Sequence, residues 1–322
     1  MTAALAAAAD ALFERPLPLV EGVYLAGSQV GQGYAAHTAG AFSEKWKALE
    51  QEDQDEEGWK LFQFRWYLQC YGYGSDEDLA RALEGRRLVL DAGCGPGHKA
   101  AWLARLRPDA TVVAMDLSDS IFLAARRYGS MPNMLFVQGD IAATPFREGA
   151  FDFINCDQVL HHTADPPATL REFRRILSVG GGLNTYVYAR KALPRELLDE
   201  HFREYSKGLS REELWALSDQ LTRLGKTLSE LAITIDVPAM PALRIAGGPM
   251  DLQRFIYWNF IKCFWNPEHG FEASRLINFD WYAPETAFRY DRDEFVALVE
   301  AAGFAAEFLH SEEACHSGRF AG

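Results

Sequence analysis

The chain has 322 residues, of which 48% are hydrophobic and 24% charged, a composition typical of a globular protein with a large core. Its 45 acidic and 32 basic residues give a net charge of −13. Proteins that bind nucleic acid need a basic face to neutralise phosphates, so this balance argues against a nucleic-acid partner. No apolar run reaches the roughly 18 residues of a spanning helix, so no membrane partner is predicted either.

The cysteines and the N-terminal stretch bear on the compartment. Five widely spaced cysteines form no CxxC pair, which predicts neither a disulfide framework nor a metal site and favours a reducing cytoplasm. The first residues, "MTAALAAAADALFE", are apolar but include Asp10 and Glu14 and lack a cationic region. They predict a frayed or docking helix, and a signal peptide is not expected.

From about residue 86 the sequence alternates between short apolar runs and longer amphipathic stretches. Strands are predicted in "RRLVLDAGCG", "ATVVAMDLS", "NMLFVQGDI", "AFDFINCDQVLHH" and "LNTYVYA", with helices between them. The last of these helices, "PPATLREFRRILSVGGG", is predicted to begin at prolines and end at glycines. This alternation predicts an α/β fold with a parallel, doubly wound sheet that binds ligands at the carboxyl ends of its strands.

The rhythm changes after Ala189. Residues 190–285 predict mainly helices, including one with a capping box at Ser210 and Glu213, and a Pro/Gly connector, "IDVPAMPALRIAGGPM". The α/β pattern then returns with a helix in "DRDEFVALVEAAGF", a strand in "AAEFLHS" and an edge strand in "SEEACHSGRF". An insertion of about 95 residues far exceeds an ordinary loop, and such insertions usually cap a ligand site.

A glycine turn after the first of these strands is the sharpest motif. It reads Asp91-Ala92-Gly93-Cys94-Gly95-Pro96-Gly97. Glycines permit positive φ and let the backbone approach a ligand. The dinucleotide motif GxGxxG would need glycine where His98 stands, and no GK[ST] follows for a P-loop. Asp116, about 20 residues on at the end of the next predicted strand, stands where a carboxylate takes both hydroxyls of an adenosine ribose.

Together with Asp116-Leu117-Ser118, Gly139-Asp140-Ile141 and "VLHHTADP", this turn resembles the class I S-adenosylmethionine-dependent methyltransferases. The small-molecule type-11 branch, which includes the ubiquinone-pathway enzymes, is the most similar. The resemblance covers roughly residues 86–190 and 290–311. It implies a transferase on a Rossmann-like, seven-stranded, doubly wound sheet, with S-adenosylmethionine as cofactor and S-adenosylhomocysteine as product.

On this basis four parts are expected. Residues 1–85 form a helical segment that closes over the cofactor site, and 86–189 form the cofactor-binding core. Residues 190–285 form a mainly helical substrate lid after the fifth strand, and 286–322 return to the core.

The resemblance also implies a cofactor site. The glycines and Cys94 lie along the methionine part, Asp116 holds the ribose, Asp140 accepts from the adenine amino group beside Ile141, and Asp157 and Gln158 line the sulfonium end. The full predicted set is Asp91, Gly93, Cys94, Gly95, Gly97, Asp116, Leu117, Asp140, Ile141, Asp157, Gln158, Tyr71 and Tyr73.

Residue-level reasoning supports this site and leaves alternatives. Four aspartates at strand ends in one crevice need donors that offset their repulsion, which a cationic, hydroxylated ligand supplies. The alternative is that each aspartate only caps the helix after it. Tyr71 and Tyr73 come from an aromatic stretch, residues 62–74, which alternatively docks its helix on the sheet.

Methyl transfer needs alignment, exclusion of water and, for some acceptors, removal of a proton. Candidate bases are His161 and His162. In the related cyclopropane-forming enzymes, the histidine matching His162 lies in the site, which favours His162. The alternative is that the pair opens a helix and binds backbone. Cys94 and Cys156 are expected to be packing residues rather than nucleophiles.

The stretch "QRFIYWNFIKCFWN", residues 253–266, predicts a mostly buried helix with the polar stripe Phe255–Asn259–Lys262–Asn266. The stripe is either the helix's one wet edge or the lining of a closed chamber. Aromatic faces suit a cation, whereas Lys262, Arg254 or Arg289 suit a carboxylate, and the sequence leaves both open. Predicted substrate residues are Asn259, Arg254, Trp281 and Arg289; Lys262 and Tyr282 join the catalytic candidates.

The predicted function is methyl transfer to a small polar metabolite in a lid-closed chamber. One alternative is an enzyme that uses the cofactor differently, by aminocarboxypropyl transfer or intramolecular cyclisation. A less favoured one is a binding protein without catalysis. The predicted partner is a small-molecule acceptor, and a homodimer is left open.

Overall fold

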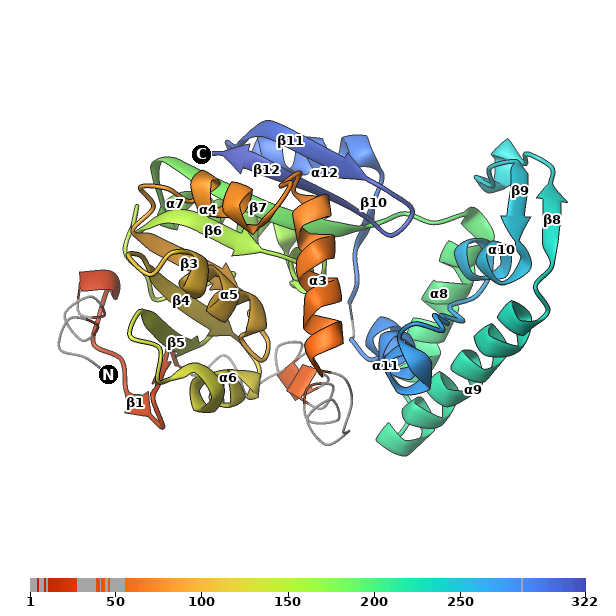
Figure 1. The fold of residues 1–322 in the computed structure, drawn as a ribbon, viewed down its shortest axis with the longest axis horizontal. Coiled ribbons are helices and arrows are strands. Elements are labelled where there is room, and N and C mark those ends of the chain that lie inside the picture. Colours follow the sequence, from red (N-terminus) through yellow and green to blue (C-terminus); the bar gives the residue numbers. More distant parts are fainter. Residues whose placement is uncertain are drawn as a thin grey trace. The chain divides into compact units, whose positions relative to one another are not determined.

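We analysed a computed structural model of the chain, which describes residues 11–27, 56–284 and 286–322 and the single positions 5, 9, 39, 40, 42, 43 and 46. The chain divides into two compact units, Met1–Ala189 with Thr286–Gly322, and Arg190–Glu285 (Figure 1). Most of the predicted N-terminal helix over residues 1–14 lies outside the described residues. No helix in the described part of the chain is long and apolar enough to cross a membrane.

The first unit contains a mixed sheet with helices between its strands. Its strands are β1 Leu19–Val20, β2 Val23–Leu25, β3 Leu88–Ala92, β4 Thr111–Asp116, β5 Met134–Gln138, β6 Phe151–Cys156, β7 Leu177–Ala189, β10 Arg289–Tyr290, β11 Ala305–Ser311 and β12 Cys315–Ala321. Its helices are α3 Glu56–Cys70, α4 Asp76–Ala82, α5 His98–Leu106, α6 Ser120–Tyr128, the 3₁₀ turn η2 Leu160–His162, α7 Pro166–Ile176 and α12 Arg292–Ala301.

Seven strands of this sheet follow the order β5-β4-β3-β6-β7-β12-β11, in which only β12 runs antiparallel to its neighbours. The chain winds from β3 to β4 and β5 on one side and then returns to β6 on the other. Ligands of doubly wound sheets bind at such a reversal, beyond the carboxyl ends of the strands. The predicted Rossmann-like α/β class is therefore confirmed.

The sheet departs from the prediction at its edges. Three short strands, β1, β2 and β10, enlarge it to ten strands. The stretch "SEEACHSGRF" was expected at an edge, but its strand β12 lies between β7 and β11. The edge prediction was wrong because a strand's position depends on long-range pairing, which a local pattern does not contain.

Alternating side chains on the central strands build two apolar layers. Leu90 of β3 and Ile154 of β6 belong to one buried cluster, which contains side chains of α7 and α12. Val89 and Phe153 on the same strands belong to the other, which contains side chains of α3, α4, α5 and α6. Helices thus cover both faces, as parallel sheets require. This packing leaves the strand ends as the place for polar side chains.

The helix predicted over "PPATLREFRRILSVGGG" is shorter than expected. It begins at Pro166, where Asp165 caps it by accepting from Ala168 N at 2.9 Å, but it ends at Ile176. The glycines belong to β7. A Cβ at Gly181 would lie 2.6 Å from Leu177 Cδ1, and one at Gly182 3.2 Å from Phe153 Cδ2. They therefore serve close approach within the sheet rather than a helix stop.

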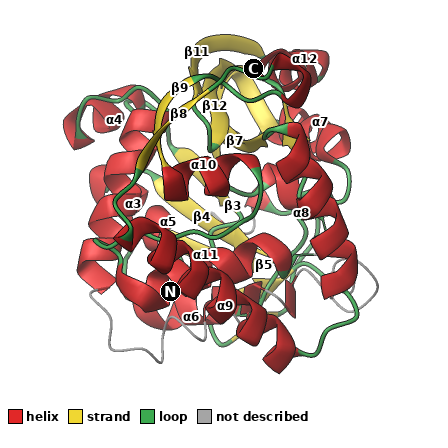
Figure 2. Cartoon of the chain, turned by 90° about the vertical axis from the view of Figure 1, so that its right-hand side faces the viewer, coloured by secondary structure: helices red, strands yellow, loops and turns green. Residues whose placement is uncertain are grey.

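The second unit is built from four described helices and a hairpin (Figure 2). They are α8 Leu193–Ser206, α9 Arg211–Glu230, β8 Thr234–Val237, the 3₁₀ turn η3 Pro241–Leu243, β9 Gly248–Asp251, α10 Leu252–Asn259 and α11 Gly270–Tyr282. The capping box of Ser210 and Glu213 is present at the start of α9. The predicted connector contains the antiparallel pair β8–β9, which pattern reading missed.

The prediction of one helix over residues 253–266 was wrong. Helix α10 ends at Asn259, and residues 260–266 are irregular. Their backbone bonds to side chains, with Phe264 N donating to Asn278 Oδ1 at 2.8 Å and Gln253 Nε2 donating to the Cys263 carbonyl at 2.9 Å. A Cβ at Gly225 of α9 would lie 2.3 Å from that carbonyl. This close backbone packing replaces the expected helical stripe.

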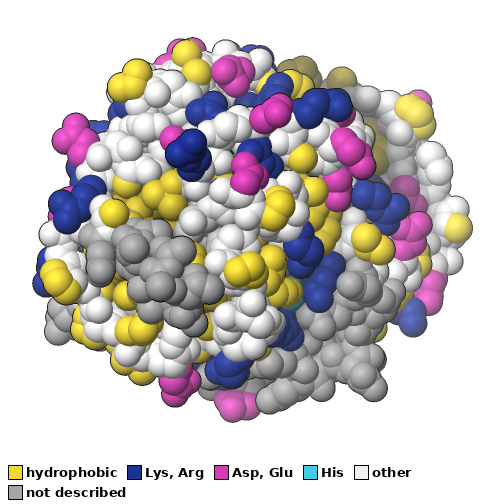
Figure 3. Space-filling view, turned by 60° about the vertical axis from the view of Figure 1, so that its left-hand side comes forward, with side chains coloured by type: hydrophobic (Ala, Val, Ile, Leu, Met, Phe, Trp, Pro, Cys, Tyr) yellow, Lys and Arg dark blue, Asp and Glu magenta, His cyan; other side chains and the backbone are white. Residues whose placement is uncertain are grey.

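Charged side chains are mixed over the described part of the face in Figure 3, where lysines and arginines lie among aspartates and glutamates.

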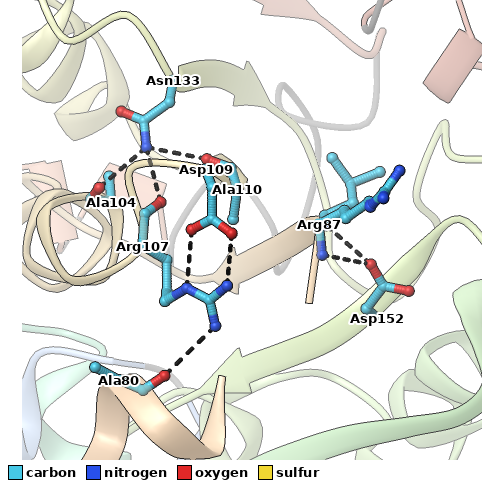
Figure 4. Close-up of polar contacts among 9 residues, drawn as sticks. Ala80, Arg87, Ala104, Arg107, Asp109, Ala110, Asn133 and Asp152 are labelled. Atoms are coloured by element: carbon cyan, nitrogen blue, oxygen red, sulfur yellow. Dashed lines mark hydrogen bonds and ion pairs between the residues drawn. The ribbon is translucent and has the colours of Figure 1, made fainter. Parts of the chain in front are cut away.

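Near the amino ends of β4 and β5, Asn133 donates hydrogen bonds to three backbone carbonyls (Figure 4). Its Nδ2 donates to Ala104 O at 3.0 Å, Arg107 O at 3.2 Å and Ala110 O at 3.0 Å. Nearby, Arg107 forms a bidentate pair with Asp109, whose side chain is 66% exposed.

This contrast yields a stability prediction. Asn133→Ala should lower the free energy of unfolding by about 1–3 kcal/mol, because it removes a shared donor from three partly shielded carbonyls, of which that of Arg107 keeps another donor, Ala110 N at 3.1 Å. Asp109→Ala removes an ion pair whose carboxylate is 66% exposed, while Arg107 keeps its contact with the Ala80 carbonyl, and should cost less than about 1 kcal/mol. Urea unfolding of both variants measures the difference. Equal losses in the two variants would contradict this assignment.

Candidate functional site

The glycine turn joins β3 to α5 at the reversal of the sheet. Gly93, Gly95 and Gly97 have φ values of +81°, +53° and +83°, in the left-handed region. A Cβ at Gly93 would lie 2.4 Å from Val159 Cγ2, and one at Gly97 2.8 Å from Ala124 Cβ. Both conformation and space therefore require glycine at Gly93 and Gly97. The N–H groups of Gly93 and Cys94 donate to the Met115 carbonyl at 2.8 Å and 3.0 Å, which fixes the turn against the end of β4.

Asp91, the carboxylate that precedes this turn, is buried. Its Oδ1 accepts from Asn155 Nδ2 at 2.7 Å, while its Oδ2 has no hydrogen-bond partner among the described residues. Burial raises the pKa of Asp91 to about 6, against the lowering effects of Asn155 and Lys99. A buried carboxylate oxygen without a donor is costly, so this atom is suited to a donor from a ligand.

A network of amides and phenols holds Asp91 in place. The Tyr67 hydroxyl donates to Asn155 Oδ1 at 2.9 Å, and Asn184 Nδ2 donates to the hydroxyls of Tyr67 at 2.8 Å and Tyr73 at 3.3 Å. Tyr73 thus contacts the site only through this network. Sequence reasoning missed Tyr67, Asn155 and Asn184. The signal was an asparagine inside each of two mostly buried and apolar strand segments, "FDFINC" and "LNTYVYA".

Asp157 stands beyond the end of β6, beside β3. Its Oδ1 accepts from the Tyr71 hydroxyl at 2.9 Å, and its Oδ2 contacts Lys99 Nζ and accepts from Gln158 Nε2 at 3.0 Å. Gln158 has φ +64°, an uncommon conformation for a residue with a side chain. The structure therefore brings Asp157, Gln158 and Tyr71 together as predicted, and adds Lys99, which sequence reasoning missed although it follows the glycine turn.

Asp116 and Asp140 accept hydrogen bonds from groups in nearby turns. Asp116 Oδ2 accepts from Gly95 N at 2.8 Å, and its Oδ1 accepts from the Ser118 backbone at 2.8 Å and hydroxyl at 2.6 Å. Asp140 Oδ1 accepts from Ala142 N at 2.8 Å. Leu117 is half-buried and Ile141 is buried in the apolar layer beneath. Asp116 does not cap the helix after it, because α6 begins after Asp119, and no helix directly follows Asp140. Both carboxylates keep further lone pairs for a ligand.

The two histidines lie in an aromatic cluster. His161 and His162 form the 3₁₀ turn after β6, with ring centroids 4.2 Å apart, and the His161 ring lies 3.8 Å from that of Tyr188. His162 Nδ1 lies 3.0 Å from the carbonyl of Thr286, and its ring packs against Phe42 at 5.3 Å. A carbonyl only accepts, so Nδ1 carries the proton and Nε2 is the basic nitrogen of neutral His162.

Cys94 and Cys156 lie in the same region without nucleophile chemistry. Both are buried, and burial raises the pKa of each thiol well above its ordinary value, with Asp116 as the next contribution at Cys94 and Asp157 at Cys156. Both are therefore neutral thiols near pH 7, as expected of packing residues.

A second group of buried polar side chains lies inside the Arg190–Glu285 unit. Arg195 Nε donates to both oxygens of Asp199 at 2.8 Å, and the Tyr282 hydroxyl donates to Asp199 Oδ1 at 2.8 Å. All three side chains are buried. The Tyr282 hydroxyl proton is thus committed to Asp199, and burial raises the pKa of Tyr282 well above its ordinary value.

Lys262 completes this group. Its Nζ donates to the Tyr257 hydroxyl at 3.1 Å and lies 4.5 Å from the Trp281 ring centroid, while the Arg195 guanidinium lies 5.2 Å from the same ring. Burial, then the charge of Arg195, lowers the pKa of Lys262 to about 7. Asp199, which pairs with Arg195, and the half-buried Asp280 both offset the charge of Lys262 in part.

The remaining substrate candidates are dispersed. Arg254 stacks 5.8 Å from the Tyr257 ring centroid, beside the Lys262 group. Asn259 donates to Phe255 O at 2.9 Å and so bonds its own helix. Arg289 belongs to β10 in the other unit, where its Nη1 donates to Ala287 O at 3.1 Å.

Comparisons with known proteins find similarity within the first unit. Residues 90–184 match the family described as a methyltransferase domain. Malonyl-[acyl-carrier protein] O-methyltransferase of Legionella pneumophila is 39% identical over 98 residues, 30% of this chain and 34% of that protein. Ubiquinone biosynthesis O-methyltransferase of Xanthomonas oryzae is 39% identical over 100 residues, 30% of this chain and 40% of that protein.

Among solved structures, a SAM-dependent methyltransferase from Aquifex aeolicus covers 86% of this chain and 97% of its own, at 12% identity and a TM-score of 0.44. The chain spans only 26% to 41% of the length of the curated relatives it matches. The family match thus identifies residues 90–184 as a methyltransferase domain, and the glycine turn and the reversal of the strand order described above lie within it.

Proposed function

We propose that the protein is an enzyme that transfers the sulfonium methyl group of S-adenosylmethionine to a small polar acceptor. The observation that carries the proposal is Asp91 Oδ2, a buried carboxylate oxygen without a described donor, beside a turn whose glycines a Cβ would crowd. The cofactor supplies an alkyl group already activated by a positive sulfur. The protein then has to bind, orient and exclude water rather than provide strong acid–base chemistry.

The roles of the site residues follow from their chemistry. Asp91 would accept from the ammonium group of the cofactor, and Asp116 from the ribose hydroxyls. Asp140 would accept from the adenine amino group, with Ile141 against the ring. Asp157, held by Tyr71 and Lys99, would line the sulfonium end. Tyr67 and Asn155 are positioning residues, because they act through Asp91.

His162 is the proposed base for acceptors that lose a proton. Its Nδ1 is committed to the Thr286 carbonyl, which orients the ring and leaves Nε2 as the basic nitrogen. His161, packed on Tyr188, would support the position of that ring. Acceptors whose attacking atom is already unprotonated would not need this residue.

The acceptor class is proposed from the interior of the second unit. Lys262 and Arg195 against Asp199 favour an acceptor that carries a carboxylate or a similar anion, with Trp281 offering an apolar face. The expectation that this unit acts as a lid stays a prediction. We also propose a cytoplasmic location, because all five cysteines are free thiols.

Product analysis tests the proposed function. The purified chain is incubated with S-adenosylmethionine and a panel of small carboxylates, amines and phenols, and products are identified by mass spectrometry. S-adenosylhomocysteine should form only when an acceptor is present. Methylthioadenosine formed without an acceptor would contradict methyl transfer, and cofactor binding without turnover across the panel would contradict an enzyme.

A matched pair of glycine variants sharpens that assay. Gly93→Ala and Gly149→Ala both place a side chain at positive φ, but only Gly93→Ala crowds the glycine turn. The first should lose cofactor binding and product formation, whereas the second should keep both.

Cofactor affinity should depend on the ionisation of Asp91. In the free protein the pKa of Asp91 is raised to about 6, so below that pH the carboxyl is protonated and cannot pair with an ammonium group. Affinity should therefore rise roughly tenfold from pH 5 to pH 7 and level off above, with a proton released on binding near pH 6. Calorimetric titration in buffers of different ionisation enthalpy measures both the affinity and the proton release.

Asp91→Asn should bind the cofactor weakly, with an affinity that changes less with pH, and Asp109→Asn should behave like the parent protein. An unchanged slope in Asp91→Asn would refute the assignment.

Lys262 is expected to lower the stability of the folded protein and to contribute to binding of the acceptor. Its pKa is lowered to about 7, well below that of a lysine in the unfolded chain. A protonated Lys262 therefore destabilises the folded state, and this cost is largest at and below pH 7. Lys262→Met should raise the free energy of unfolding at pH 7 by about 1–4 kcal/mol, and the gain should shrink toward pH 10.

The same change should raise the KM of the acceptor while the affinity for the cofactor stays unchanged. Lys226→Met, at a half-exposed lysine on α9, is the control and should alter neither. Loss of stability in Lys262→Met at every pH, with no effect on acceptor KM, would make Lys262 a structural residue only.

A further inference from the structure

Three sulfur and nitrogen side chains meet away from the cofactor site. Cys70 ends helix α3, while His310 lies near the end of β11 and Cys315 begins β12. The potential ligand atoms of these three residues all lie within 4.8 Å of one another. None of them has a role in the proposed methyl transfer. The sequence predicted no metal site, because CxxC is absent and Cys70 is distant from the other two.

A carboxylate stands beside them. Glu312 lies in the turn between β11 and β12, with Oε1 3.7 Å from Cys315 Sγ and Oε2 3.5 Å from His310 Nε2. Its Oε1 also accepts from Trp66 Nε1 at 3.3 Å, which orients the group. The tight hairpin thus delivers three potential ligands within six residues, and α3 delivers the fourth.

The two cysteines of the cluster are buried, whereas its histidine and glutamate are partly exposed. Cys70 and Cys315 are 1% and 0% exposed, whereas the side chains of His310 and Glu312 are 18% and 28% exposed. His310 Nε2 is buried and has no hydrogen-bond partner among the described residues.

We propose that Cys70, His310, Glu312 and Cys315 bind one Zn²⁺ ion in a tetrahedral site. Metal–ligand distances of about 2.0–2.3 Å place tetrahedral ligand atoms roughly 3.3–3.8 Å apart. The contacts of Glu312 Oε1 with Cys315 Sγ, at 3.7 Å, and of Glu312 Oε2 with His310 Nε2, at 3.5 Å, have that spacing. The ligand atoms of Cys70, His310 and Cys315 need to approach one another by at most about 1 Å. Binding releases the two thiol protons to solvent.

The ligand types favour zinc over other occupants. Two thiolates, an imidazole and a carboxylate in a compact, closed site suit Zn²⁺, whereas magnesium and calcium prefer oxygen ligands at higher coordination number. A disulfide between Cys70 and Cys315 would use the two sulfurs alone and give no role to His310 and Glu312, whose side chains lie 3.5 Å apart beside them.

The ion would fasten α3 to the sheet. Ser317 Oγ already donates to the Cys70 carbonyl at 2.7 Å, and Gly72 packs so closely that a Cβ there would lie 2.5 Å from the Phe308 ring. Tyr67 and Tyr71, which contact Asn155 and Asp157, lie in the last turn of α3 and just after it. The proposed site therefore supports the helix that completes the cofactor site.

Metal analysis of the full chain tests this proposal without reference to activity. The protein is purified without chelators, and zinc is measured by elemental mass spectrometry. Affinity is measured by competition with a chromophoric chelator. Replacement by Co²⁺ should give the visible bands of tetrahedral coordination and a near-ultraviolet thiolate charge-transfer band. One Zn²⁺ per chain is expected.

Variants identify the ligands. Cys315→Ser should weaken the thiolate charge-transfer band, because one of the two thiolates is lost. His310→Ala, at a partly exposed position, should weaken zinc affinity at least about tenfold. Cys263→Ser, at a buried cysteine in the other unit, is the control and should keep one ion. Stoichiometric zinc in His310→Ala at unchanged affinity would overturn the proposal. So would a zinc-free parent protein, whether peptide mapping finds Cys70 and Cys315 as a disulfide or as free thiols.

Discussion

The burial of carboxylates at neighbouring strand ends is the constraint on which the first unit depends. Asp91 lies near the end of β3 and Asp157 directly follows the adjacent parallel strand β6, where the sheet order reverses. Their charges repel, and burial makes each costly without a donor. Asn155 and Lys99 satisfy part of this need, and Tyr71 satisfies another part. Asp91 Oδ2 is what remains, and a cationic ligand is the natural complement.

Much of this site follows from local sequence. Glycines at Gly93 and Gly97 are required by backbone conformation and by space, so their spacing alone indicated a cofactor turn. The aspartates were predictable because strand ends can be recognised from apolar runs. The positioning residues were not, because the role of Asn155 depends on Asp91 and Tyr67, which reach it from other elements.

The failures also have one physical origin. Gly181 and Gly182 were assigned to a helix end, whereas they relieve crowding against Leu177 and Phe153 within β7. The aromatic stretch was assigned to one helix. In its second half, however, the Cys263 carbonyl packs closely on Gly225, and the Phe264 backbone donates to the Asn278 side chain. In each case a long-range contact outweighs local propensity, and a single sequence carries no record of such contacts.

A crystal structure with bound S-adenosylhomocysteine tests the central claim most directly. The account predicts that the ligand's ammonium nitrogen lies within hydrogen-bonding distance of Asp91 Oδ2, with Asn155 still donating to Oδ1. Its carboxylate and sulfur should follow the turn from Gly93 to Gly97. A ligand bound elsewhere, or a turn that fills the space beside Asp91 with its own backbone, would contradict the account.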